Sequence, residues 1–346
     1  MEYNNAMKRV NIILVGFGKV GNAFLQVAHE KTEFCQRHYR LDLKFHSICE
    51  IGGALFSSDP LDIGQILAES NSLSLLRESP FWKSGRTLQE VLSSIEPGVL
   101  VECTPSNIKS GEPGLSHLRQ ALERGWHVAT ANKGPLVVDF RGLREKAKKN
   151  EVALKISGAT AAALPTLDVA LYSLAGTDVY RIEGILNGTT NYILTRMREG
   201  MDYRQALEEA QSKGIAEPEP SQDVEGWDTA SKILLITNAV LDSDFALDDV
   251  KVEGITAIPA HLLDQGRAEG RALKLLGRFS KEEGARLEVS LRLIDHSHPL
   301  FGVNGANKGI TFATDTMHSV TVTGGKSDPR GAGAALLKDI INIYWR

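Results

Sequence analysis

Short apolar runs that alternate with segments of helical periodicity organise the first half of the chain. The first run is Val10–Val15, which stops at a glycine turn before apolar residues recur at helical spacing. Similar runs follow at Leu43–Cys49, Val99–Cys103 and His127–Thr130. Strands that alternate with helices in this way form a parallel sheet with helices on both faces. The pattern therefore predicts a doubly wound α/β domain.

Two further helices are expected in this half, over Leu61–Glu69 and Thr87–Ile95, because both segments have a helical pattern of apolar residues. Gly52-Gly53-Ala54 is expected to open a loop, since paired glycines commonly interrupt regular structure.

The composition changes after Val152, where the small-residue segment Ser157–Ala163 ends at Pro165. We place a domain boundary near this segment. Beyond it, strands and helices do not alternate regularly, and the second domain is predicted to be α+β. The expected strands are Val179–Leu186, Arg271–Phe279, Leu287–Ile294 and Ser319–Thr323, and the expected helices are Asn187–Met197, Asp202–Lys213 and Arg330–Tyr344. The predicted domains are residues 1–155, completed by the C-terminal segment 325–346, and residues 156–324.

A predicted helix from about Val224 to Val240 is apolar on nearly all sides apart from Asp228 and Lys232. Asp223 is expected to cap its first turn. A helix that is apolar all round is buried, so its few charges must be paired or face a polar cavity. An Asp–Lys pair four residues apart is commonly a solvated surface pair. Burial favours the alternative, which is that the pair takes part in chemistry.

The composition excludes several classes of protein. With 346 residues, of which 42% are apolar and 24% charged, the chain is long enough for two globular domains. Its net charge of −4 and isoelectric point near 6.2 argue against a nucleic-acid partner or a membrane-surface anchor. The longest stretch of low polarity, 152–176, contains charges and proline and cannot span a membrane as an uninterrupted apolar helix. We therefore expect a cytoplasmic location.

Three cysteines, Cys35, Cys49 and Cys103, are too few and too scattered for a disulfide framework or a zinc cluster. We interpret them as reduced packing residues and assign no metal ligands.

The turn after the first run, Gly16-Phe17-Gly18-Lys19-Val20-Gly21, has the dinucleotide-binding fingerprint in its strand–turn–helix context. Gly16 makes the turn, Gly18 lets the backbone approach a pyrophosphate, and Gly21 packs the helix on the strand. Lys19 and Val20 begin the helix whose N-terminus faces the anion. A purely structural glycine turn is the alternative, and the flanking strand and helix favour the functional interpretation. The first domain is thus predicted to be a Rossmann-type nucleotide-binding domain.

Carboxyl ends of the predicted strands supply further cofactor-binding candidates, because open α/β sheets bind ligands at that edge. Glu50 ends the second strand, where an acidic residue binds ribose hydroxyls and repels a 2′-phosphate, which favours NAD over NADP. Thr104 and Pro105 leave the third strand. Lys133 follows the fourth strand, so its ammonium is expected to point into the cofactor crevice. An exposed lysine at a helix start is the alternative.

Small and hydroxyl-bearing residues begin the helix that follows Val179–Leu186. Backbone N–H groups at Gly188 and Thr189 can hold the carboxylate of a ligand at such a helix start. Ordinary N-capping by Thr189 is the alternative interpretation.

Four separated motifs together resemble those of homoserine dehydrogenase. They are GFGKVG at Gly16–Gly21, TANK at Thr130–Lys133, GILNGTTNYIL at Gly184–Leu194 and GIAEPEPSQDVEGWDTASK at Gly214–Lys232. The resemblance spans nearly the whole chain. It implies the interconversion of L-homoserine and L-aspartate 4-semialdehyde with NAD or NADP, a step in threonine, methionine and isoleucine biosynthesis.

The resemblance also implies which residues bind the substrate. Gly188 and Thr189 correspond to the backbone contacts of the substrate. Glu217, assisted by Asp223, corresponds to the carboxylate that holds the substrate's amino group.

Three more residues correspond to the family's catalytic set. Asp228 and Lys232 match the pair next to the reacting hydroxyl, and Lys133 matches the other catalytic lysine, at the junction of nicotinamide and substrate. Oxidation of a primary alcohol removes a hydride and a proton, so an acid/base group must touch the hydroxyl. We favour Lys133 for proton transfer and Lys232, held by Asp228, for positioning, although the two lysines can exchange these roles.

The chain departs from the family pattern at several places, among them the segment Val303–Gly309, which keeps the family's glycine and Asn307 but then diverges. Ser157 stands where many members carry a glutamate linked to a monovalent cation, so the sequence leaves the cation site open. Glu219 replaces a small polar residue or Asp, and no role follows for it. Gly331-Ala332-Gly333 is a shortened form of the family's glycine cluster, of which Gly333 is the cofactor-binding candidate.

The resemblance implies a homodimer formed through the sheet of the second domain, with a small-molecule substrate as the other partner. Because the sequence continues only to Arg346, we expect no regulatory ACT domain of the kind that some members append. Two other functions stay open. One is a dehydrogenase for a related small amino acid or semialdehyde, and the other is a non-catalytic NAD-binding regulatory protein.

Overall fold

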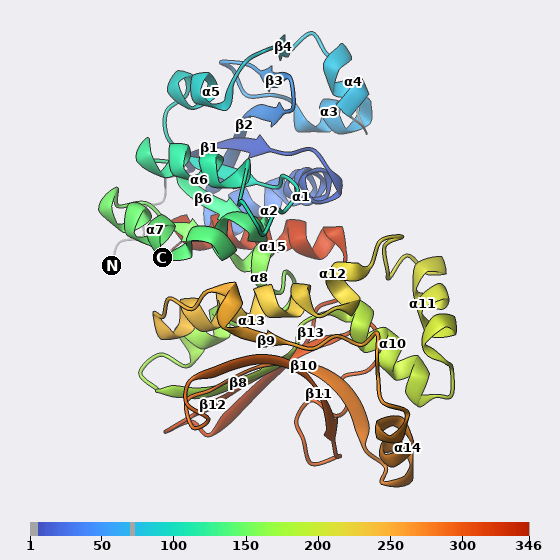
Figure 1. Ribbon diagram of the computed structural model, residues 1–346. Coiled ribbons are helices and arrows are strands. Elements are labelled where there is room, and N and C mark those ends of the chain that lie inside the picture. The colour runs from blue at the N-terminus through green and yellow to red at the C-terminus, as the bar shows by residue number, and fades with distance from the viewer. Residues whose placement is uncertain (1–5, 70–72, 346) are drawn as a thin grey trace. The chain divides into compact units, whose positions relative to one another are not determined.

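The computed structural model describes residues 6–69 and 73–345 (Figure 1). The chain divides into two compact units, one made of residues up to Ala162 together with Asp328–Arg346, and one made of Ala163–Ser327. A mixed α/β architecture with two separate sheets confirms the predicted fold class.

The first unit contains a mainly parallel sheet whose strands run in the order β4-β3-β2-β1-β5-β6-β7. Neighbouring strands from β2 through β1, β5 and β6 to β7 are parallel, whereas β3 pairs antiparallel with both β2 and β4. The strands are β1 Lys8–Val15, β2 Leu41–Glu50, β3 Gly53–Phe56, β4 Trp82–Ser84, β5 Val99–Glu102, β6 His127–Thr130 and β7 Leu154–Lys155.

Helices follow the strands of this sheet as the alternating pattern predicts. They are α1 Lys19–Glu30, α2 Thr32–Phe34, η1 Cys35–Tyr39, α3 Ile63–Glu69, α4 Leu73–Glu78, α5 Leu88–Ser94, α6 Gly114–Glu123, α7 Lys133–Lys149, α8 Ser157–Thr160 and α15 Pro329–Tyr344. Val10, Ile12 and Leu14 from β1 pack with Phe24 of α1 and Leu336 of α15 in one hydrophobic core. The last helix of the chain is therefore part of the first unit.

Gly333 shows how closely α15 packs on α1, beside which it lies in Figure 1. A Cβ at Gly333 would lie 2.8 Å from the backbone nitrogen of Phe24 and 2.9 Å from the carbonyl carbon of Ala23. Only glycine fits this contact, so Gly333 brings the N-terminal part of α15 to α1.

The loop expected at Gly52-Gly53-Ala54 is wrong beyond its first residue. Gly53 already begins β3, which pairs with Glu50 of β2 and continues to Phe56. Gly52, with φ of 90°, makes the tight reversal between the two antiparallel strands. Paired glycines here mark a hairpin and not a long loop.

The second unit contains a sheet in the order β13-β12-β8-β10-β11-β9. Its strands are β8 Val179–Ile185, β9 Val250–Val252, β10 Ala272–Ser280, β11 Arg286–Ile294, β12 Lys308–Thr314 and β13 Ser319–Gly324. Its helices are α9 Thr166–Asp168, η2 Val169–Ser173, α10 Gly188–Arg198, α11 Tyr203–Ser212, α12 Ser221–Val224, α13 Trp227–Leu241, η3 Leu247–Asp249 and α14 Ala260–Ala268. Gly277 of β10 lies against Thr229 and Ile233, so α13 covers one face of this sheet.

The helix predicted from about Val224 to Val240 is present as α13 but begins at Trp227, and the short helix α12 precedes it. Gly226, with φ of 92°, breaks the segment between α12 and α13, and a Cβ there would lie 2.6 Å from the carbonyl oxygen of Glu253. Asp223 consequently lies inside α12 and does not cap α13. Its carboxylate instead accepts a hydrogen bond from the side chain of Asn187.

None of the helices in the described ranges combines the length and apolar content that a membrane span needs.

Candidate active site

The glycine turn of the first unit brings α1 very close to the strands β1 and β5. Gly16 has φ of 93°, and a Cβ there would lie 2.7 Å from the carbonyl carbon of Cys103. A Cβ on Gly21 would lie only 2.0 Å from the carbonyl oxygen of Gly16. Both positions therefore require glycine, which is the close backbone packing that the dinucleotide fingerprint demands.

A pocket of about 650 Å³ lies between the N-terminal ends of α1 and α15. Helix N-termini carry partial positive charge, and Lys19 and Arg330 add full positive charges to the lining. Arg330 also pairs with Glu30 on α1, with Nη1 2.9 Å from Oε1 and Nη2 2.5 Å from Oε2. Asp328 caps α15 and adds a negative charge to the lining, so the N-terminus of α1 with Lys19 is the part of the pocket that can bind a diphosphate. The pocket lining consists of Phe17, Gly18, Lys19, Asn22, Ala23, Gln26, Asp328, Pro329 and Arg330.

Glu50 lies at the end of β2, beside the glycine turn. Its Oε1 accepts a hydrogen bond from the backbone N–H of Phe17 at 2.5 Å, and its Oε2 accepts one from Ile51 at 3.1 Å. The turn thus holds a carboxylate where the fingerprint places the adenosine ribose. Nearby, Arg77 donates to the carbonyl oxygen of Ile51 at 2.9 Å.

The end of β5 carries a buried polar network that the sequence analysis did not identify. Glu102 is fully buried and accepts hydrogen bonds from the backbone N–H of Thr104 at 2.7 Å and from its hydroxyl. Nδ1 of His117 lies 2.9 Å from the other oxygen of Glu102. Asn132 donates to the Thr104 hydroxyl at 3.0 Å. A charged residue that ends an apolar strand was the available signal for Glu102.

Lys133 is the first residue of α7, directly after the cap that Asn132 forms by accepting from the N–H of Gly134 at 3.0 Å. Ser106, next to the predicted cofactor residues Thr104 and Pro105, accepts from the same N–H at 2.9 Å. The structure therefore brings the segments after β5 and β6 together at one edge of the sheet, with Lys133 among them.

In the second unit, Asn187 joins the carboxylates predicted to bind substrate and to support catalysis. Its amide nitrogen donates to Asp223 Oδ1 at 2.7 Å and to Asp228 Oδ2 at 2.8 Å. Its side-chain oxygen accepts from the N–H of Thr190 at 2.8 Å and so caps α10. Asn187 thus links the start of α10 to α12 and α13, and sequence reasoning missed it because it considered Thr189 as the cap.

Asp228 and Lys232 form the pair that their spacing on α13 predicts. Lys232 Nζ lies 2.5 Å from Asp228 Oδ2 and donates to the carbonyl oxygen of Leu186 at 3.0 Å. The side chains of Asp228 and Lys232 are only 8% and 14% exposed, so this is not a solvated surface pair. Within the described residues, these bonds use two of the three ammonium hydrogens, and the third can reach a ligand oxygen.

Asp223 lies next to this pair, and the pKa of its carboxyl is raised above the ordinary value. Burial raises the pKa of its carboxyl, and the negative charge of Asp228 raises it further, while Lys232 and hydrogen bonds from Asn187 and Thr189 lower it. The Thr189 hydroxyl also donates to the carbonyl oxygen of Ile215 at 3.0 Å. These contacts bring the loop before α12 to the start of α10.

Gly188 fits closely against the segment before β12. A Cβ at Gly188 would lie 2.8 Å from the carbonyl oxygen of Ala306, so glycine is required there. Glu217 and Glu219 are both exposed on the loop between α11 and α12. The structure shows the exposure of Glu217 and gives no account of Glu219.

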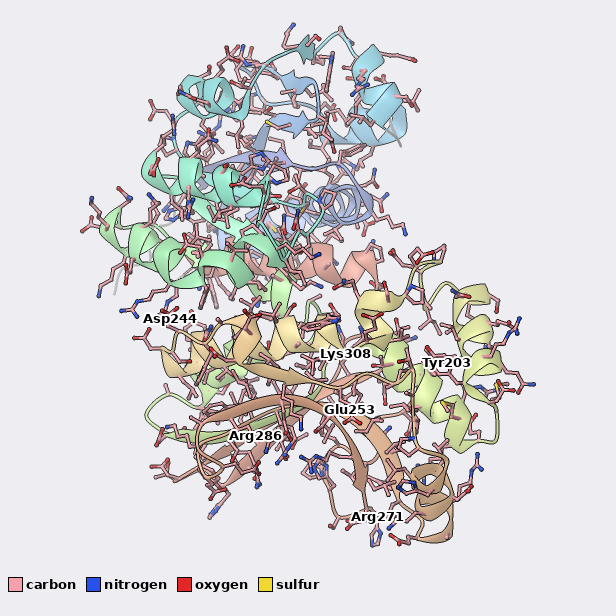
Figure 2. All side chains as sticks on the ribbon, in the orientation of Figure 1. Tyr203, Asp244, Glu253, Arg271, Arg286 and Lys308 are labelled. Atoms are coloured by element: carbon pink, nitrogen blue, oxygen red, sulfur yellow. The ribbon has the colours of Figure 1, made fainter. Side chains whose placement is uncertain are left out.

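Two buried lysines of the second unit also escaped the sequence analysis. Lys274 is 2% exposed and donates to the carbonyl oxygen of Val303 at 2.5 Å, to Asn191 Oδ1 at 3.1 Å and to Asn304 Oδ1 at 3.0 Å. Lys308, labelled in Figure 2, is 2% exposed at the start of β12. For Lys274, the signal was a charge among the apolar residues of Ala272–Leu276.

Two family models match the two halves of the chain. The one described as "Homoserine dehydrogenase, NAD binding domain" matches residues 16–156, and the one described as "Homoserine dehydrogenase" matches residues 165–341. The chain is 36% identical to a homoserine dehydrogenase of Methanocaldococcus jannaschii, over 97% of this chain and 98% of that protein. The chain belongs to the homoserine dehydrogenase family.

Other homoserine dehydrogenases also match nearly the whole chain. An NAD(+)-dependent homoserine dehydrogenase of Pseudomonas canavaninivorans is 31% identical over 98% of this chain and 97% of that protein. A hyperthermophilic archaeal homoserine dehydrogenase solved in complex with NADPH has a TM-score of 0.82 and 25% identity, and the match covers 98% of this chain and all of that one. As a family member, the chain is an NAD(P)-dependent oxidoreductase with a Rossmann-type NAD-binding domain.

Proposed function

We propose that this enzyme interconverts L-homoserine and L-aspartate 4-semialdehyde, with Lys232, Asp228 and Lys133 as its catalytic residues. The observation that carries this proposal is the buried Asp228–Lys232 pair, joined through Asn187 to Asp223. An amino alcohol has a cationic end and a hydroxyl end. Adjacent carboxylates and an ammonium group match both ends of such a substrate.

The amino end of the substrate is assigned to Glu217 and Asp223. An ammonium group gains charge-assisted hydrogen bonds from carboxylates, and Glu217 is open to solvent on its loop. The substrate carboxylate is assigned to the backbone N–H groups at Gly188 and Thr189, where α10 begins and its dipole favours an anion.

The alcohol end is assigned to the two lysines. Asp228 orients Lys232 through their ion pair, so that Lys232 can donate a hydrogen bond to the alcohol oxygen. Lys133 takes the hydroxyl proton during oxidation and returns it during reduction. A nicotinamide cofactor supplies the hydride acceptor when it is bound. The turn residues Gly16–Gly21, with Thr104, Pro105 and Gly333, are assigned to holding it.

Preference for NAD over NADP is part of the proposal. Glu50 presents a carboxylate beside the glycine turn, and a 2′-phosphate placed there would meet a like charge. Arg77 is the residue that could offset this effect, since arginine accommodates 2′-phosphates. Its contact with the carbonyl oxygen of Ile51 favours a structural role instead.

The first unit is accordingly assigned to cofactor binding, and residues 163–327 to substrate binding and dimerisation. We place the homodimer contact on the face of the second sheet that lies opposite α13. Arg278 on that face pairs with Glu183 and Glu288 at 2.8 Å each. Sedimentation of the purified protein tests the dimer.

A cytoplasmic location fits the three cysteine thiols, none of which is in a disulfide.

A spectrophotometric assay tests the proposed reaction. Homoserine oxidation is followed with NAD and with NADP side by side, and related amino alcohols serve as competing substrates. We expect the highest kcat/KM for homoserine with NAD. Higher kcat/KM for another amino alcohol would contradict the substrate assignment, and a preference for NADP would contradict the role given to Glu50.

A further inference from the structure

Ser157, the first residue of α8, is tied to α15 by a compact set of hydrogen bonds. Its backbone N–H donates to Asp339 Oδ2 at 3.0 Å, and its hydroxyl donates to Oδ1 at 2.7 Å. Lys338 Nζ donates to the Ser157 hydroxyl oxygen at 2.8 Å and lies 3.2 Å from Asp339 Oδ1. A single serine thus lies between a carboxylate and an ammonium group.

The carboxylate of this cluster is almost completely withdrawn from water. Asp339 is 1% exposed, and burial raises the pKa of its carboxyl, whereas the charge of Lys338 and the bonds from Ser157 lower it. A buried carboxylate needs a nearby cation, because an unpaired charge inside a protein is strongly destabilising. The Lys338 side chain is 34% exposed, so its ammonium reaches this buried carboxylate from the surface of α15.

α8 in turn lies against the segment that leads to Lys133. A Cβ on Gly158 would lie 3.0 Å from the carbonyl oxygen of Thr130 and 3.1 Å from the Cα of Ala131. Lys133 follows two residues later, at the start of α7. A shift of α8 away from α15 would therefore remove the support behind this segment.

We propose that the Lys338 ammonium is a built-in monovalent cation for the buried Asp339 carboxylate, which holds α8 in place behind Thr130–Lys133 without an added metal ion. Ser157 contributes only a hydroxyl where many family members carry a glutamate, and the carboxylate comes from α15 instead. Lys338 is a positioning residue. Its effect on turnover rests on the role proposed for Lys133, whereas its effect on stability does not.

Salt substitution at constant ionic strength tests this proposal. The thermal unfolding midpoint and kcat are measured in sodium, potassium, ammonium and tetramethylammonium chloride for the wild type, Lys338→Met and the control Lys149→Met, an exposed lysine on α7. Wild type and control are expected to be indifferent to the cation. Lys338→Met is expected to have a lower midpoint and a kcat reduced about 10- to 100-fold in tetramethylammonium, with both recovering in a small cation.

The other possible results either overturn or uphold the role of Lys338. Wild-type activity that depends on sodium or potassium overturns the proposal, as does a Lys338→Met variant that matches the wild type in tetramethylammonium or fails to recover in any small cation. If Lys338→Met does not fold, the double variant Lys338→Met/Asp339→Asn decides, because removal of both charges is expected to restore folding without cation dependence. Recovery of the midpoint with an unaltered kcat throughout would uphold the cation role and contradict the role of Lys133.

Discussion

The Asp228 carboxylate and the Lys232 ammonium lie 2.5 Å apart on successive turns of α13, and both are largely buried. Asp228→Asn keeps the shape of the side chain but removes the charge that orients Lys232. We expect kcat for homoserine to fall about 100-fold or more, because a misplaced catalytic group costs on the order of this factor. Steady-state kinetics, with cofactor binding measured by fluorescence titration, checks the prediction.

The exposed Asp248 provides the matched control for this change. Asp248→Asn is expected to leave kcat unaltered. A similar decrease in both variants, or a loss of cofactor binding in Asp228→Asn, would show that the charge acts through overall stability and not on the reaction.

Titration of the Asp223 carboxyl is expected to make substrate binding depend on pH. Because burial raises the pKa of its carboxyl above the ordinary value of 3.8, protonation begins at a higher pH than for an exposed aspartate. The ionised form is the one that attracts the substrate's ammonium group, so kcat/KM for homoserine is expected to fall as the pH decreases through this raised pKa. In Asp223→Asn, kcat/KM should be low at every pH and this acidic limb should disappear. An unchanged limb in the variant would assign it to another group.

Much of the fold follows from the sequence because its signals are local. Strand–glycine–helix order, Asp202 before α11 and Gly214 after it each act over a few residues, and all of them reappear in the structure. β9 and β12 escaped the sequence analysis because pairing with distant strands, and not an alternating pattern, defines them. β3 escaped it because the paired glycines of the hairpin were interpreted as a loop. The break at Gly226 likewise depends on the carbonyl of Glu253, which is remote in sequence.

The candidate site likewise contains residues that local sequence signals predict and residues that they do not. The Asp228–Lys232 pair was predictable because helical spacing alone places the two side chains together. The roles of Asn187 and His117 were not, because each connects carboxylates or strand ends that only the folded chain brings within hydrogen-bonding distance. Asp339 is 182 residues from Ser157 in sequence, and no pattern in either segment indicates their contact.

The negative charge of Glu50 is expected to set the preference for NAD over NADP. Glu50→Gln preserves an oxygen that can accept from the N–H of Phe17 but removes the negative charge. The ratio of kcat/KM with NAD to kcat/KM with NADP is expected to decrease about 10-fold or more, since juxtaposed like charges cost several kcal/mol. Glu78→Gln on the exposed face of α4 is the control. A ratio that stays constant in Glu50→Gln would leave discrimination to other residues, of which Arg77 is the first to test.

The buried Lys274 is expected to make the free energy of unfolding depend on pH. Burial lowers the pKa of its ammonium from 10.5 to about 8. Between these values the unfolded chain binds one proton more than the folded chain, so this group makes stability rise with pH, and its full destabilising effect is present below pH 8. Relative to Lys274→Met, the wild type should gain up to about 3 kcal/mol of unfolding free energy between pH 8 and 10.5.

Urea unfolding of both proteins at several pH values measures this difference, and Lys251→Met, at an exposed position of β9, is the control. A difference between wild type and Lys274→Met that does not vary with pH would mean that Lys274 stays charged throughout this range.

The assignment of Lys133 and Lys232 to the reacting alcohol is the central claim, and kcat for homoserine in Lys133→Ala and Lys232→Ala tests it most directly. The exposed Lys251→Ala is measured beside them. Each of the two variants is expected to lose turnover by about two orders of magnitude or more while its dissociation constant for NAD stays close to that of the wild type. Full turnover in both variants would contradict the account.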